Sequence, residues 1–275
     1  MTLSEAVSHL HRVAISILKQ REKIALIRKH RRELWGFFRR QKVLTLNALG
    51  EQQYLFHESY RRLSEEITEL TAQQWDRIWE EIARNSNKDL QTLIAAAEAD
   101  GLIKGAEQLK RSFIGGLHAK TTFNLANPRA VAWFQQNGGS VEKIAGIQRT
   151  TGDQIKTIIT KALDEGWSYN QTAKEISVRF NGFSRERALV IAVNETALAY
   201  EEGNMLFSQS LVDDGVRMEK MYQTSEDNRV SELCQGNQND GWIPLNQLHT
   251  SGVQQPPGHI RCRCYELYRE VPKAE

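Results

Sequence analysis

Hydrophobic residues recur with two different periods along the chain, and the change of period marks a change of structure. Over residues 3–34 they return every three to four positions, which predicts one long amphipathic helix or two in line. The helical spacing continues through 51–110 and returns at 129–136 and 153–165. Nearer the C-terminus, residues 216–222 alternate between apolar and polar, as a strand does. The sequence therefore predicts a mainly α protein with a small C-terminal α+β module.

Capping residues suggest helix boundaries in the second half of the chain. Pro128 suits the first turn of the helix that follows it, because an N–H at that position has no helical partner. Ser168 has Gln171 three residues later, which is the spacing of a capping box, and the helix that begins there is expected to stop at Gly182. Ser184 then caps a separate helix. Two successive helices are predicted in this segment.

The patterns favour two domains. Residues 1–125 are expected to form a helical N-terminal domain with a basic arm. Residues 126–275 form the second domain, in which helices fill 126–212 and a strand-and-loop module fills 213–270. Within the module, a Pro-Pro-Gly turn precedes a second strand candidate at 260–268.

The composition excludes several classes of protein. With 275 residues, 40% hydrophobic and 25% charged, the chain is typical of globular proteins. It has no run of about 18 apolar residues, so we expect no membrane span. The N-terminus carries His and Arg within its apolar pattern and no small-residue cleavage site, so no signal peptide is expected. Three cysteines are too few for a disulfide framework, which favours a reducing compartment.

Charge is distributed unevenly. Residues 1–50 carry a net charge of +8 and residues 51–100 a net charge of −6. One interpretation is a helix that packs on its neighbours with a solvated charged face. The other is an arm that neutralises phosphates, because clustered cations release counterions when they bind DNA. The candidate binding residues are Arg28, Lys29, Arg31, Arg32, Arg39, Arg40 and Lys42.

Two of the three cysteines lie one residue apart near the C-terminus. Cys262 and Cys264 would point to the same side of a strand, with His259 at the preceding turn and Cys234 about thirty residues earlier. A Cys₃His set suits structural zinc, which could supply much of the folding energy of a small module. Buried thiols without a ligand are the alternative from local chemistry, and a disulfide or redox role is a third.

Three charged residues stand out beside the cysteines, and we interpret them as structural. Glu195 lies near the apolar face of its helix, either buried beside a cation such as Arg229 or exposed. Asp227 and Arg229 occupy a turn, where such residues commonly fix the backbone. The chain has no Gly-rich phosphate loop, no Gly-x-Ser-x-Gly and no His-Glu-x-x-His, so the sequence predicts no catalytic site.

The order of these features resembles a known family. An acidic helix is followed by a strand, Asp227-x-Arg229, Cys234 and a His-x-x-Cys-Arg-Cys terminus, and this order is similar to the phage Mu F-like family of head morphogenesis (minor head) proteins of tailed bacteriophages. The resemblance covers roughly residues 125–270. Ser231 stands where the family often has the first cysteine of a Cys-x-x-Cys, and Val193-Asn194 replaces the family's Arg-Thr.

The resemblance implies a non-enzymatic minor head protein, found inside the phage head and in the host cytoplasm during assembly. Its implied partners are the portal protein, capsid and scaffold proteins, and double-stranded DNA. Two alternatives remain. The first is a toxin-type enzyme such as an ADP-ribosyltransferase, in which Glu195 would need an arginine where Val193 stands. The second is a zinc-stabilised nucleic-acid-binding module that acts outside any virion.

Overall fold

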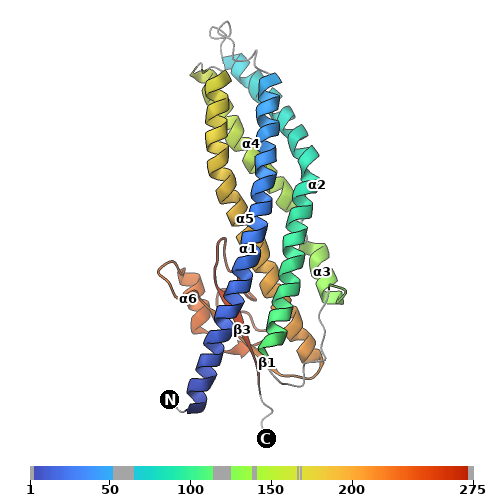
Figure 1. Cartoon of the computed structure of the whole chain (residues 1–275), viewed down its shortest axis with the longest axis vertical. Helices are drawn as coiled ribbons and strands as arrows, with labels where there is room; N and C mark the ends of the chain where they lie inside the picture. The colour runs from blue at the N-terminus through green and yellow to red at the C-terminus, as the bar shows by residue number, and fades with distance from the viewer. Residues whose placement is uncertain are drawn as a thin grey trace. The chain divides into compact units, whose positions relative to one another are not determined.

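The computed structural model describes residues 3–51, 65–113, 125–137, 141–165, 167 and 169–271. Most of these residues lie in helices, and a small antiparallel sheet follows near the C-terminus, so the predicted fold class is confirmed (Figure 1). None of the helices in the described ranges is long and apolar enough to cross a membrane. The helices are α1 (Leu3–Glu51), α2 (Glu65–Ser112), α3 (Pro128–Asn137), α4 (Val141–Asp164), α5 (Tyr169–Asp213) and α6 (Glu232–Asn239).

The chain forms two compact units, each assembled from segments that are distant in sequence. The sheet unit comprises Met1–Arg31, Ala95–Gly138 and Val190–Glu275. The helical unit comprises Arg32–Ile94 and Gly139–Leu189. The predicted domain boundary at 125/126 stays a prediction, and residues 114–124 beside it lie outside the described residues.

Helix α5 corrects the prediction of two successive helices. Gly182 and Ser184 lie in its interior, and Ser168 lies outside the described residues. The hydroxyl of Ser184 is buried and lies 3.4 Å from the carbonyl oxygen of Asn181, so it bonds within the helix and caps no helix end. Glycine inside a helix costs about 1 kcal/mol relative to alanine, which tertiary packing can offset. Here Phe180 is buried, and it stacks on the ring of Phe183 at 4.6 Å between centroids.

In the sheet unit, α2 and α5 approach each other through glycines. A Cβ atom at Gly203 would lie 2.8 Å from the carbonyl carbon of Leu102 and closer still to its oxygen. A Cβ atom at Gly105 would meet the backbone of Tyr200 in the same way. Only residues without a side chain fit at such positions. The glycines therefore set how near the two helix axes lie, and apolar residues of both helices close into a core with Met218.

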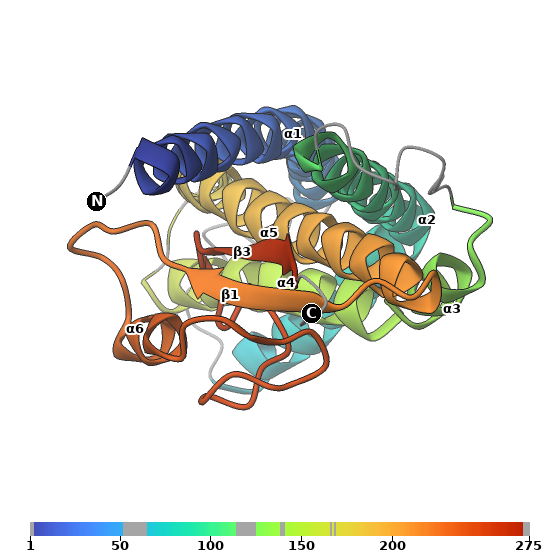
Figure 2. The same ribbon diagram turned by 90° about the horizontal axis from the view of Figure 1, so that it is seen from below.

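The three described strands are β1 (Met218–Gln223), β2 (Ile243–Pro244) and β3 (Tyr265–Glu270), and they form an antiparallel sheet in the order β2-β1-β3. Strand β1 alternates buried and half-buried residues, as the sequence pattern predicts. Figure 2 shows β1 and β3 side by side along the C-terminal part of α5.

The second strand begins later than the residue 260 predicted for it. Residues 259–262 form a turn, in which the backbone N–H of Cys262 donates to the carbonyl oxygen of His259 at 3.1 Å. Arg261 adopts a left-handed backbone conformation, with φ of 63°, which no strand accommodates. Strand β3 therefore starts at Tyr265, beyond all three cysteines.

Candidate functional site

Three buried cysteines and one tyrosine gather beneath the sheet, and we call them the thiol cluster. The sulfur atoms of Cys234, Cys262 and Cys264 all lie within 4.8 Å of one another. The Sγ atoms of Cys234 and Cys262 are 3.8 Å apart, far beyond the length of a disulfide bond, and all three thiols are free. The hydroxyl of Tyr222, on β1, lies 3.3 Å from the sulfur of Cys234 and 3.4 Å from that of Cys262.

Local structure brings these residues together from three segments. Cys234 lies in the first turn of α6, and the backbone N–H of Cys234 donates to the hydroxyl of Ser231, the N-cap residue, at 3.3 Å. Serine is among the residues preferred at this position. Ser231, which replaces a cysteine of the family pattern, therefore has a capping role here. Cys262 follows the turn at 259–262, and Cys264 directly precedes β3.

His259 was predicted to join the cysteines, but the structure does not place its imidazole in the thiol cluster. The side chain is exposed, and its Nδ1 atom lies 2.8 Å from the carbonyl oxygen of Ile260. The turn at 259–262 separates the imidazole from the thiols that follow it. Tyr222 lies beside the thiols instead. The spacing of cysteines and histidines in the sequence does not predict this contact.

The thiols share their protons unequally. The pKa of Cys262 is lowered and that of Cys264 is raised, because the Cys262 thiolate accepts a hydrogen bond from the Cys264 thiol. Burial raises the pKa of Tyr222 well above its usual value, and nearby thiolates raise it further, so the hydroxyl keeps its proton. Of these two thiols, Cys262 therefore ionises first.

The donor set and its spacing fit zinc. With Zn–S bonds of about 2.3 Å, a tetrahedral site holds its sulfurs about 3.8 Å apart. The Cys234–Cys262 separation of 3.8 Å matches this value. Thiolate is also a ligand that zinc prefers in structural sites. Three cysteines so placed could supply three of the four ligands of a tetrahedral zinc site.

A buried charged network connects the module to α1 and α5. The ammonium group of Lys23 lies 2.9 Å from a carboxylate oxygen of Glu201 and donates to the carbonyl oxygen of Cys264 at 3.0 Å. The other carboxylate oxygen of Glu201 accepts from the backbone N–H of Glu266 at 3.2 Å. His249 lies 2.9 Å from the Glu266 carboxylate. Sequence reasoning missed this network, because its members are far apart in the chain.

The three charged residues interpreted as structural differ in their surroundings. Asp227 forms a bidentate ion pair with Arg263 and accepts a hydrogen bond from the backbone N–H of Arg229 at 3.0 Å. The pKa of Asp227 is lowered, first by the hydrogen bond from Arg263. The Asp-x-Arg turn is thereby tied to the Cys-Arg-Cys segment. Arg229 is 73% exposed and lies 3.8 Å from Asp227, and Glu195 is half-buried on α5.

Most of the predicted basic residues are exposed on α1. Lys29 is paired with Asp100 at 2.6 Å, and the ammonium group of Lys42 lies 3.1 Å from the side-chain oxygen of Asn181. The guanidinium of Arg39 lies over the ring of Trp35 at 5.7 Å. The remaining four form no hydrogen bond or ion pair with any described residue: Arg28, Arg31, Arg32 and Arg40.

The fold and the site define a mainly α protein whose C-terminal module is braced by buried thiols and charge pairs. Residues 153–266 match the family described as Phage Mu protein F like protein. The match begins within α4, ends in β3 and encloses α5 and the thiol cluster. It confirms the resemblance and supports a phage head morphogenesis protein. The chain has no match among curated proteins or solved structures.

Proposed function

We propose that this protein is a non-enzymatic minor head protein of a tailed phage, which binds the portal or the inner face of the capsid during procapsid assembly. The observation that carries the proposal is the family match over residues 153–266, which contains the whole thiol cluster. The buried contacts of that region stabilise a fixed module, as a structural protein requires. Host cytoplasm during assembly and the phage head afterwards are its proposed locations.

Assembly in infected cells tests this role. A tagged full-length chain, expressed during infection, is expected to co-sediment with procapsids and to cross-link to portal or capsid subunits. Lys23→Ala leaves the buried Glu201 carboxylate without this cation, which destabilises the module, and this variant is expected to be depleted from particles. The proposal is wrong if the parent protein never accompanies portal, scaffold or capsid subunits.

We also propose that α1 contacts double-stranded DNA. Arg28, Arg32 and Arg39 are spaced by four and seven residues, so the helical repeat places them on one face. All three are exposed, and none is ion-paired to a described residue. Cations without partners neutralise DNA phosphates without first breaking an ion pair, and each contact adds about 0.9 to the salt slope.

A double variant tests the basic face. Arg28→Gln with Arg32→Gln is expected to weaken binding to a 30-base-pair duplex and to reduce the salt slope by about 1.8. The matched control is Arg77→Gln with Arg84→Gln, which removes two exposed arginines from α2. Equal binding by the two double variants would show that the face has no role in DNA binding.

Finally, we propose that Cys234, Cys262 and Cys264 supply three of the four ligands of a structural zinc ion, which would cross-link α6 to the segment before β3. The support is the mutual distance of the three sulfurs and their burial. Purified protein is expected to contain about one zinc per chain, and Cys264→Ser is expected to lose it. His259→Ala is the informative comparison, because the imidazole lies outside the cluster and its loss should leave the zinc content unchanged. Protein that never takes up zinc would favour the buried-thiol interpretation.

A further inference from the structure

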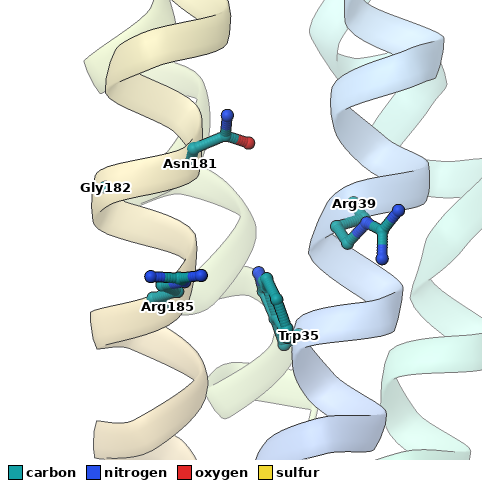
Figure 3. A pocket seen from close by; sticks show the side chains of 5 residues that line it. All are labelled: Trp35, Arg39, Asn181, Gly182 and Arg185. Atoms are coloured by element: carbon teal, nitrogen blue, oxygen red, sulfur yellow. The ribbon is translucent and has the colours of Figure 1, made fainter.

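A shallow pocket of about 380 Å³ opens on the surface of the helical unit. Its lining residues are Trp35 and Arg39 from α1, and Asn181, Gly182 and Arg185 from α5. Figure 3 shows the indole of Trp35 and the side chain of Arg185 approaching each other across the gap between the two helices, with Asn181 on the turn beyond. The volume is within the range of sites that hold small molecules or parts of larger ligands.

The pocket concentrates positive charge that no described side chain neutralises. The guanidinium of Arg185 lies 5.0 Å from the centre of the Trp35 ring, and that of Arg39 lies 5.7 Å from it. Both arginines are exposed, and neither has a carboxylate partner among the described residues. The ammonium group of Lys42 is also close, because it lies 3.1 Å from the side-chain oxygen of Asn181.

The indole of Trp35 lies between the two guanidinium groups and contacts both. A guanidinium over an aromatic face is attracted by the ring quadrupole, which orients the group without cancelling its charge. Trp35 is half-buried, and its ring contacts both arginines. Guanidinium groups present paired N–H donors that match phosphate oxygens. The arrangement is therefore prepared for an anion with several oxygen atoms.

We infer that this pocket binds a backbone phosphate of double-stranded DNA through the guanidinium of Arg185, while Arg39, on the other side of Trp35, adds positive charge. The inference rests on the proposed DNA-binding function and assigns to it a site on α5 as well as α1. Arg39 belongs both to the pocket and to the basic face with Arg28 and Arg32. A row of cations that continues into an anion pocket suits a polymer with repeated phosphates better than one acidic side chain.

The test compares single arginine variants of the full-length protein on a 30-base-pair duplex. Arg185→Gln is expected to reduce the salt slope by about 0.9, so its loss of affinity is about three to four times larger at 50 mM salt than at 200 mM. Arg185→Lys retains the charge and is expected to retain the slope. Arg84→Gln, an exposed arginine of α2 outside the pocket, is the matched control.

The outcomes separate this inference from the proposed function. If Arg185→Gln binds like Arg84→Gln while the Arg28/Arg32 double variant is impaired, the pocket inference is wrong and the basic face stands. If neither the pocket variant nor the double variant differs from its control, DNA binding through α1 and through the pocket is refuted. A polyglutamate probe that binds the parent protein but not Arg185→Gln, with duplex binding unchanged, overturns the phosphate assignment in favour of an acidic protein segment.

Discussion

Replacing Gly203 by alanine would place a methyl group in the closest approach between α2 and α5. The new Cβ atom would lie 2.8 Å from the carbonyl carbon of Leu102, whereas ordinary contacts of a Cβ atom begin at 3.4 Å. The obstacle is backbone, so the helices must separate by more than half an ångström. Overpacking of this kind costs about 1–3 kcal/mol. Alanine recovers about 1 kcal/mol of helix propensity, which leaves a net loss of up to about 2 kcal/mol.

Gly182→Ala, in the same helix, is the matched control. A Cβ atom at Gly182 meets nothing within 4 Å, so this variant is expected to gain about 0.5–1 kcal/mol from helix propensity alone. Thermal unfolding measures both changes, since 1 kcal/mol shifts Tm by about 2–4 °C in chains approaching this size. The two variants should therefore shift Tm in opposite directions. A Gly203→Ala protein as stable as Gly182→Ala would refute the close helix contact.

Two further predictions concern buried charges. Lys23→Ala leaves the buried Glu201 carboxylate without this cation, and removal of one partner of a buried ion pair costs about 3–5 kcal/mol. Denaturant unfolding should show that Lys23→Ala combined with Glu201→Gln loses less unfolding free energy than Lys23→Ala alone. An equally large loss in the double variant would contradict the pairing. Burial raises the pKa of Glu202 to about 7, against a hydrogen bond from Gln255 that lowers it. The ionised form is therefore disfavoured in the fold, and stability falls as pH rises from about 4.5 to about 7. Glu202→Gln should reduce that fall in a comparison of Tm at pH 5 and pH 8, and an unchanged pH profile would contradict it.

Periodic patterns predicted the elements of the fold but not all their ends. The alternation at 216–222 identified β1, because one face of the strand is buried and the other half-buried. The same reasoning failed at Gly182 and Ser184, where local capping signals are present inside a continuous helix. Ser184 is buried and bonds within its own helix, so packing decided the outcome. At the start of β3, the positive φ of Arg261 breaks an apparently regular strand pattern.

The candidate site residues could be predicted only where they lie close together in the sequence. Cys262 and Cys264 lie one residue apart, which suggests a shared site. Cys234 could be assigned to the same site because it is the third of the three cysteines in the chain. Tyr222 was not predictable, since a tyrosine in a strand is ordinary and only β1 packing brings its hydroxyl 3.3 Å from Cys234. Arg185 was missed for the same reason, because its neighbour Trp35 is 150 positions earlier in the sequence.

The locations of these contacts bear on the proposed role. The Lys23–Glu201 pair is buried in the sheet unit, and the half-exposed Asp227–Arg263 pair lies at its surface, and each contacts a segment beside the cysteines. Lys23 does so through the carbonyl oxygen of Cys264. Four exposed arginines of α1, Arg28, Arg31, Arg32 and Arg40, are instead left without carboxylate partners among the described residues. One helix therefore contributes a buried charge to the stability of the module and exposed charges to the proposed contact with DNA. A protein that must hold its own fold while it binds an anionic polymer needs both kinds of charge, and burial is what separates them along α1.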